Sequence, residues 1–151
     1  MLNIGDLAPE FELTSDEGSI VKLSDYRGQR VLIFFYPKAG TSGCTTQACG
    51  LRDNFPVFEN AGAVVLGVSP DEPEALAKWR KKEQLPYNLL SDPDHVIAEA
   101  YGVWGEKTLY GRSYMGIIRS HFVVDAAGKL QDVQFKVSPN VSIEQAVKQF
   151  K

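Results

Sequence analysis

The chain has 151 residues, of which 44% are hydrophobic and 23% charged, and its formal net charge is -3. This composition is typical of a globular protein with a substantial core, and a slightly acidic chain argues against nucleic acid or an anionic membrane as a partner. The N-terminus lacks a charged n-region and an apolar h-region, so we expect a cytoplasmic protein. We find no repeat or linker and predict one domain over residues 1–151.

The first third of the chain predicts a hairpin, a buried strand and a helix. Segments 10–14 and 19–23 flank a turn and are expected to pair as an N-terminal β-hairpin. Residues 30–36 form a near-continuous apolar run, which is typical of a central strand buried on both faces. From Gly43 onward, apolar residues at spacings of three and four predict a helix, which Pro56 should break because proline has no N–H to donate.

The middle of the chain predicts a second strand and a second helix. Residues 63–69 are apolar and are expected to form a strand. A helix should then begin near Pro73 and direct Leu76 and Trp79 toward the core. Strand, helix and strand at this spacing predict a parallel crossover unit.

The last third predicts two short elements, a hairpin and a closing helix. A strand is expected at 89–90 and a helix at 94–101. Segments 117–124 and 130–137 alternate around a turn and predict a β-hairpin. Ser142-Ile143-Glu144-Gln145 reads as a capping box at the start of the final helix. The alternation of strand and helix patterns predicts an α/β protein.

The two cysteines lie where the strand at 30–36 turns into a helix. Cys44 follows Pro37 and Thr41 at this turn, and Cys49 comes five residues later. A helix N-terminus presents unpaired N–H groups and the positive end of the helix dipole, and both favour a thiolate over a thiol. In a reducing compartment, cysteines are more often catalytic or metal-binding than structural. The pattern indicates an oxidisable cysteine pair in which Cys44 is the reactive member.

The motif Pro37-x3-Thr41-x2-Cys44 resembles the active-site loop of the peroxiredoxins. The C-x4-C spacing to Cys49 is similar to that of the peroxiredoxin Q/bacterioferritin comigratory protein subfamily. The likeness continues, in the family's order, through Ser69-Pro70-Asp71, Leu90-Ser91-Asp92-Pro93, segment 101–107 and segment 115–120. Ser42 stands where the family usually has a second proline, but the other motif residues are retained.

The resemblance implies a thioredoxin-like fold, with an N-terminal β-hairpin extension and a central mixed sheet flanked by helices. It also implies a peroxidase that reduces hydrogen peroxide and organic hydroperoxides, in which Cys44 is the peroxidatic thiol and Cys49 the resolving thiol of an intramolecular disulfide. Thioredoxin or a similar dithiol reductant would recycle that disulfide. The family further implies a monomer that needs neither a metal nor an organic cofactor.

The same resemblance implies a substrate site formed by Pro37, Thr41, Gly43 and Arg119. The Thr41 hydroxyl would hydrogen-bond a peroxide oxygen. The guanidinium of Arg119 would stabilise both the thiolate and the leaving oxygen. Pro37 would fix the path of the loop and shield the sulfur from water.

The spacing of the two cysteines sets a geometric condition on a disulfide between them. Five residues of ideal helix rise about 7.5 Å, which places the two Cα atoms roughly 8 to 9 Å apart. A disulfide requires less than about 7 Å. Cys44 and Cys49 can therefore be joined only if the first helical turns unwind. Gly50 costs about 1 kcal/mol of helix propensity relative to alanine, so we expect it to favour that unwinding.

Three other functions compete with the peroxidase. A thioredoxin-type oxidoreductase would need C-x-x-C, which the chain lacks. A zinc site of Cys44, Cys49, His95 and His121 is not supported by their spacing, and structural roles are the better interpretation of the two histidines. A silent interaction module is disfavoured by the intact set of reactive residues. The aromatic residues of segment 104–114 fit packing better than a peroxide pocket, and we assign them no role.

Overall fold

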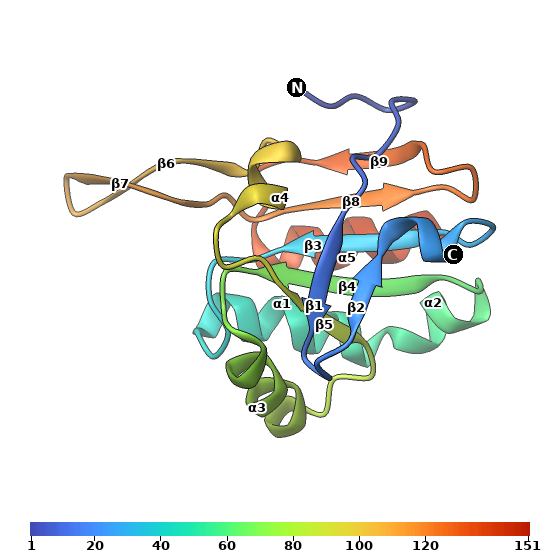
Figure 1. The fold of residues 1–151 in the computed structure, drawn as a ribbon, viewed down its shortest axis with the longest axis horizontal. Helices are drawn as coiled ribbons and strands as arrows, with labels where there is room; N and C mark the ends of the chain where they lie inside the picture. Colours follow the sequence, from blue (N-terminus) through green and yellow to red (C-terminus); the bar gives the residue numbers. More distant parts are fainter.

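The computed structural model describes all 151 residues as a mixed α/β fold (Figure 1). The strands are β1 (Glu12–Ser15), β2 (Ile20–Lys22), β3 (Val31–Phe35), β4 (Val64–Ser69), β5 (Asn88–Ser91), β6 (Trp104–Leu109), β7 (Arg112–Ile117), β8 (Ser120–Val124) and β9 (Leu130–Gln134). The helices are α1 (Ser42–Asp53), α2 (Phe55–Asn60), α3 (Pro73–Glu83), α4 (Val96–Ala100) and α5 (Pro139–Phe150), with one 3-10 turn, η1, at Leu23–Tyr26. None of the helices is both long and apolar enough to cross a membrane.

A seven-stranded mixed sheet organises the fold, with the strand order β2-β1-β5-β4-β3-β8-β9. Strands β3, β4 and β5 run parallel to one another, and the remaining pairs are antiparallel. The predicted parallel crossover is confirmed on both sides of β4, which is reached from β3 through α1 and α2 and leads through α3 to β5. The N-terminal hairpin and the β8–β9 hairpin are confirmed as well. The central mixed sheet with flanking helices agrees with the predicted fold class.

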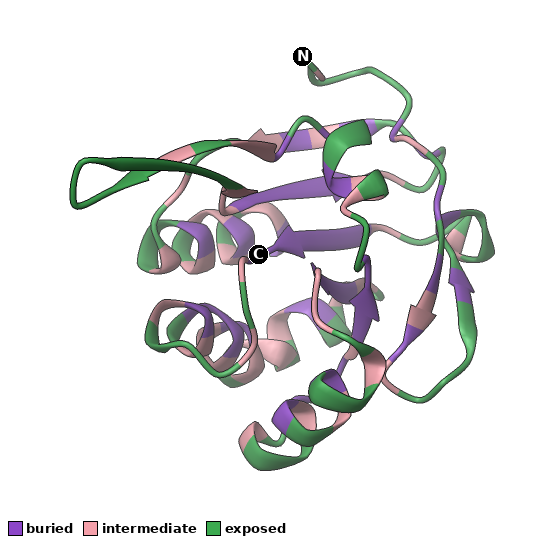
Figure 2. Cartoon of the chain, turned by 60° about the vertical axis from the view of Figure 1, so that its left-hand side comes forward, coloured by how far each residue is buried: buried purple, intermediate pink, exposed green.

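Strand β3 separates two hydrophobic clusters, which explains its unbroken apolar sequence. Leu32 and Phe34 point into a cluster with α1, α2, α3 and α5 on one face of the sheet. Ile33 and Phe35 point into a second cluster, which α4 and the N-terminal segment cover. Every residue of β3 is buried, and the strand is entirely purple in Figure 2. Burial on both faces removes the need for polar alternation.

The predicted break at Pro56 is confirmed. Helix α1 ends at Asp53, Asn54 lies between the two helices, and Pro56 occupies the first turn of α2. Proline is tolerated in the first turn because the N–H groups there have no partner within the helix.

The capping box predicted at Ser142 is wrong. Helix α5 begins at Pro139, and Ser138 is its N-cap, with a side-chain oxygen that accepts a hydrogen bond from the Val141 N–H at 3.3 Å. Ser142 lies one turn further on and is completely buried. Its hydroxyl contacts other buried side chains and therefore does not cap the helix.

A two-stranded hairpin, β6–β7, was not predicted. It projects away from the seven-stranded sheet, and Figures 1 and 2 show it as a largely exposed arm. The strand expected over 117–124 is therefore two strands, because β7 ends at Ile117 and β8 begins at Ser120. The strand expected over 130–137 also ends three residues earlier, at Gln134. Exposure of both faces gives this hairpin no clear alternating pattern to read.

Candidate active site

Cys44 lies in the first turn of α1, directly beyond the carboxyl end of β3. Its side chain is only 1% exposed. Cys44 is the third residue of the helix, and the N–H groups of a first turn have no partner within the helix. The sulfur therefore lies at the positive end of the helix dipole, as the sequence predicted.

Asp71 holds the loop that precedes Cys44 through hydrogen bonds. The carboxylate of Asp71 accepts hydrogen bonds from the Ala39 N–H at 2.8 Å and from the Ser69 hydroxyl at 2.7 Å. The Ser91 hydroxyl donates to the Asp71 carbonyl at 2.7 Å. The ends of β4 and β5 therefore fix the loop between Pro37 and Thr41, which explains why segments distant in sequence carry the same family likeness.

Thr41 is the N-cap residue of α1, but its side chain does not cap the helix. Its hydroxyl donates to the Lys38 carbonyl at 2.7 Å and so closes a tight turn. With its hydrogen used in this way, the exposed oxygen retains lone pairs that can accept a hydrogen bond. Gly40 lies within the turn at a φ of 85°, a region that a residue with a side chain rarely adopts.

Arg119 reaches Cys44 because β8 pairs antiparallel with β3. This pairing places Ser120 opposite Phe35, so the start of β8 meets the end of β3. From the two residues that separate β7 from β8, the Arg119 Nη2 donates to the Cys44 Sγ at 3.5 Å. Its Nη1 donates to the Oε1 of Gln47 at 2.7 Å. The structure thus brings together two predicted site residues that are 75 positions apart.

Gly43 lies against the guanidinium. A Cβ atom at this position would be 3.0 Å from the Nη2 of Arg119, closer than most Cβ contacts. The missing side chain therefore lets the guanidinium approach the first turn of α1. Pro37 is half-buried at the start of the loop, and Ser42, which stands where the family usually has proline, is exposed.

Cys49 lies on the same helix in a different environment. It is half-buried, and burial raises the pKa of its thiol, with a further contribution from Glu83 and opposition from the nearby Arg52. Both thiols are free, and α1 is continuous through both positions. The helix must therefore open before the two sulfurs can meet.

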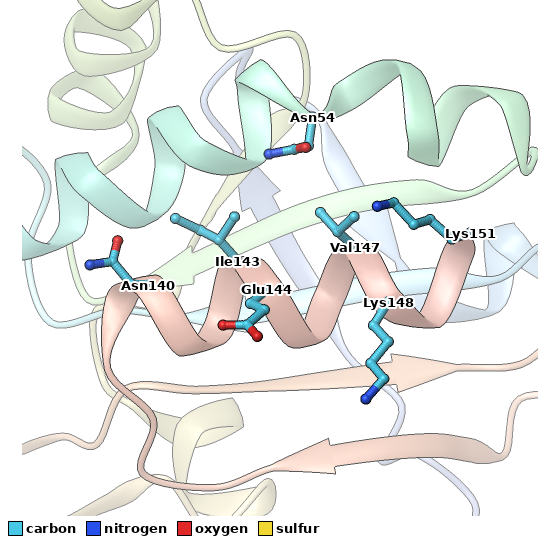
Figure 3. Close-up of a pocket in the computed structure, with 7 residues that line it drawn as sticks. All are labelled: Asn54, Asn140, Ile143, Glu144, Val147, Lys148 and Lys151. Carbon is cyan, nitrogen blue, oxygen red and sulfur yellow. The ribbon is translucent and has the colours of Figure 1, made fainter.

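The structure gives Gly50 a second role that its helix propensity did not predict. A Cβ atom at Gly50 would overlap the Cδ1 of Ile143. Figure 3 shows Ile143 and Val147 directed from α5 toward α1 and α2. Gly50 therefore permits close packing of α1 on α5, in addition to weakening the helix.

A cleft of about 580 Å³ lies on the Arg119 side of the site. It is lined by Glu106, Lys107, Thr108, Ile118, Arg119, Lys136, Val137 and Ser138. Burial lowers the pKa of Lys107, and the charge of Arg119 adds to this effect. The Lys107 ammonium also donates to the Ile117 carbonyl at 2.7 Å. The base of the exposed hairpin thus adds a second cation near the reactive cysteine.

The residues of the alternative zinc site do not come together. No group of three or more His, Cys, Asp or Glu side chains is arranged to hold a metal ion. His95 pairs with Glu99 at 3.0 Å, and its ring stacks on Trp104. His121 is buried and hydrogen-bonded to Ser142 at 2.7 Å. Both histidines thus contact other side chains of the fold, but the buried Nε2 of His121 has no hydrogen-bond partner.

Gln47 is a site residue that the sequence analysis missed. It is completely buried and is the side-chain acceptor for the Arg119 Nη1. Its position three residues after Cys44 places it on the same face of α1, and this spacing was the available signal. Tyr110 and Tyr114 are exposed on the β6–β7 hairpin, and Trp104 packs on His95, so none of the three needs a role in the site.

Comparisons with known proteins identify the relatives of this chain. Residues 4–133 match the model of the AhpC/TSA family. Over 139 residues the chain is 52% identical to peroxiredoxin Bcp of Escherichia coli, which covers 91% of this chain and 89% of that protein. It is 44% identical to peroxiredoxin Bcp of Bacillus subtilis, over 99% of this chain and 96% of that one.

Solved structures show the same likeness. The bacterioferritin comigratory protein of Xanthomonas campestris, studied for its alkyl peroxide reduction activity, superposes with a TM-score of 0.87 at 30% identity, over 93% of this chain and 89% of that one. Peroxidoxin BcpB of Mycobacterium tuberculosis gives a TM-score of 0.88 at 32% identity, over 99% and 97% of the two chains.

The thioredoxin fold is thus shared with solved peroxiredoxins, and the chain belongs to the AhpC/TSA family of peroxiredoxins. Peroxide is the substrate class of that family, and a thiol compound supplies the electrons. Within the family, the relatives place the chain among the Bcp and peroxiredoxin Q proteins.

Proposed function

We propose that Cys44 is the peroxidatic residue and reduces hydrogen peroxide and organic hydroperoxides. The Cys44 thiolate attacks one peroxide oxygen, the O–O bond breaks, and the other oxygen leaves with a proton as water or an alcohol. Cys44 becomes a sulfenic acid, oxidised by two electrons. The observation that carries this proposal is the 3.5 Å contact between the Arg119 Nη2 and the Cys44 Sγ at the start of α1.

The substrate site is proposed to consist of Pro37, Thr41, Gly43 and Arg119. The guanidinium of Arg119 stabilises the thiolate before the attack and the leaving oxygen during it. Thr41 accepts a hydrogen bond from the peroxide with the oxygen whose own hydrogen is held by Lys38. Gly43 leaves room for the guanidinium, and Pro37 holds the loop over the sulfur.

Cys49 is proposed to resolve the sulfenic acid. Its sulfur attacks the Cys44 sulfur, water leaves, and an intramolecular disulfide forms. Because α1 is helical through both cysteines, this step requires local unwinding of the helix. Both members of the pair belong to one helix of one chain, so the proposed cycle needs no second copy and is compatible with a monomer.

Thioredoxin or a similar dithiol reductant is proposed to complete the cycle. One thiolate of the reductant attacks the Cys44–Cys49 disulfide, and its second thiol releases the peroxiredoxin in the dithiol form. The reductant leaves as a disulfide, so the two electrons taken by peroxide are replaced. A reducing compartment such as the cytoplasm would supply this reductant.

Mass spectrometry of the peroxide-treated protein tests the proposal. We expect a peptide that joins Cys44 to Cys49 within one chain, and consumption of reductant when thioredoxin and its reductase are added. The Cys49→Ser variant is the matched control, because it should consume one equivalent of peroxide and then stop cycling with thioredoxin. A disulfide between two chains, or cycling of the variant at the parental rate, would remove Cys49 from the resolving role.

A further inference from the structure

A chain of buried polar side chains leads from the active site into the protein. It begins at Arg119, whose Nη1 donates to Gln47 at 2.7 Å. The Nε2 of Gln47 donates to the Ser142 hydroxyl at 2.9 Å, and that hydroxyl lies 2.7 Å from the Nδ1 of His121. Gln47, Ser142 and His121 are all fully buried. We call these three residues the buried latch.

Arg119 determines the orientation of Gln47, the first residue of the buried latch. Arg119 has only donors, so the Gln47 oxygen must face it, and the Gln47 amide nitrogen must face Ser142. Beyond the other end, the Nε2 of His121 lies 3.7 Å from the carboxylate of Asp132, which is an acceptor. In the tautomer with its hydrogen on Nε2, the imidazole directs that hydrogen toward the carboxylate and accepts the hydrogen of Ser142 at Nδ1, although Nε2 itself makes no hydrogen bond.

The charge of Asp132 favours the imidazole tautomer that carries its hydrogen on Nε2. Burial opposes its ionisation, but His121, Gln134 and the Val133 N–H hold the pKa of its carboxyl below the ordinary value. The carboxylate therefore stays charged near neutrality. The 3.7 Å separation is longer than a hydrogen bond, so its effect on the His121 Nε2 is electrostatic.

The buried latch connects the segment that must unwind to parts that remain folded. Gln47 lies between Cys44 and Cys49 on α1, whereas Ser142 belongs to α5 and His121 to β8. Figure 3 shows α5 running alongside α1, and Gly50 allows the two helices to approach closely. Unwinding residues 44–49 would withdraw Gln47 and break its bonds to the Arg119 Nη1 and the Ser142 hydroxyl, whereas the contact between Ser142 and His121 would remain. An unpartnered buried polar atom is costly, so the latch opposes unwinding.

We infer that Gln47, Ser142 and His121 hold Arg119 against Cys44 and hold α1 folded, and that Gln47 must release from this latch before Cys49 can resolve the sulfenic acid. The inference rests on the proposed roles of the two cysteines. The latch residues are positioning residues, because none of them contacts the peroxide-reactive sulfur. The same contacts therefore favour attack on peroxide and delay disulfide formation.

The delay determines what happens to the sulfenic acid. While α1 is folded, a second hydroperoxide can oxidise Cys44 from sulfenic to sulfinic acid and leave as water or alcohol. A tighter latch lengthens this exposure, and a broken latch shortens it. The latch thus sets the resistance of the protein to inactivation by excess peroxide.

The test is Ser142→Ala, compared with Tyr87→Phe as a matched control. Both changes remove one buried hydroxyl that contacts α1 or its side chains, but the Tyr87 hydroxyl donates to the Ala48 carbonyl at 2.7 Å and has no link to Arg119. Stopped-flow fluorescence with a peroxide pulse separates Cys44 oxidation from disulfide formation, and mass spectrometry counts sulfinic product.

We expect Ser142→Ala to slow attack on peroxide about three- to tenfold and to accelerate disulfide formation by a similar factor. Its sulfinic product should need more peroxide than in the parent. Tyr87→Phe should accelerate disulfide formation and leave the attack rate unchanged. Parental rates for both phases in Ser142→Ala, or slower attack in both variants alike, would overturn the latch.

A second variant keeps the test valid if Ser142→Ala does not fold. Ser142→Ala/His121→Leu removes both partners of one hydrogen bond, so it leaves fewer unpartnered atoms, and the same opposite shifts are expected. If the parent itself formed no Cys44–Cys49 disulfide, the proposed function would fail, whereas normal parental phases with unshifted variants would refute only the latch.

Discussion

The two cysteines of α1 share a helix but occupy opposite environments. Cys44 is almost completely buried at the positive end of the helix, 3.5 Å from a guanidinium. Cys49 is half-buried, lies near Glu83, and has a thiol whose pKa is raised by burial. Five positions along one helix are therefore enough to separate a buried sulfur in contact with a guanidinium from a half-buried thiol whose pKa is raised. The different proposed roles of the two cysteines therefore follow from their environments and not from residue type.

In the proposed cycle, this difference also accounts for the persistence of the Cys44 sulfenic acid until Cys49 reacts with it. In the folded helix, burial raises the pKa of the Cys49 thiol and so favours its protonated form. Unwinding exposes it and returns its pKa to the ordinary range, which increases its reactivity. In the proposed cycle, the same conformational change would both bring the two sulfurs together and activate the second one.

The largest expected effect comes from Cys44→Ser. A serine hydroxyl is scarcely ionised near neutrality and is a much weaker nucleophile, so peroxide consumption should fall to the background rate. A peroxide assay with thioredoxin recycling measures this directly, and Cys49→Ser, which keeps the first oxidation, is the comparison. Turnover by Cys44→Ser would show that the buried cysteine is not the reactive one.

Arg119→Lys tests the cation that distinguishes the two environments. Lysine keeps the charge but loses the planar fork that contacts the Cys44 sulfur and Gln47 together. We expect the second-order rate with peroxide to fall about 10- to 100-fold. Stopped-flow measurement of the rate, with the pH dependence of Cys44 alkylation, provides the check. No change in either quantity would place Arg119 outside the chemistry.

Gly50→Ala tests the packing of α1 next to Cys49. Helix propensity alone predicts stabilisation of about 1 kcal/mol. Contact of the new methyl group with Ile143 instead predicts a loss of about 1 to 3 kcal/mol in the free energy of unfolding. Urea denaturation distinguishes the two results. Ile143→Ala removes the side chain that the new methyl group would contact. If Gly50→Ala lowers the free energy of unfolding as much in the Ile143→Ala background as in the parent, this explanation is wrong.

The smallest expected effect concerns the pH dependence of Cys49. Because burial raises the pKa of the folded thiol, the protonated form is favoured by folding. Its contribution is complete below the unfolded pKa of about 8.5 and is lost as pH rises from there through the folded pKa. In Cys44→Ser, iodoacetamide should react with Cys49 more slowly at pH 8 in the native protein than in urea. Equal rates would mean that the folded environment does not protect this thiol.

The order of the main elements and the reactive end of α1 were predictable from the sequence. Apolar runs, a proline break and the Pro37–Cys44 motif are signals that span only a few neighbouring residues. The start of α5 was misread because two serines offered similar local signals. Ser138 caps the helix, whereas Ser142 is engaged by Gln47 and His121 from distant parts of the chain.

Only the tertiary structure decided which elements contact one another. Antiparallel pairing of β3 with β8 delivers Arg119 to Cys44, and packing of α1 on α5 gives Gly50 its neighbour. The buried latch likewise joins residues up to 95 positions apart. Sequence alone established which groups can be reactive, because that depends on residue type and local backbone. Which groups meet depends on strand register and helix packing, and these are set by the whole core.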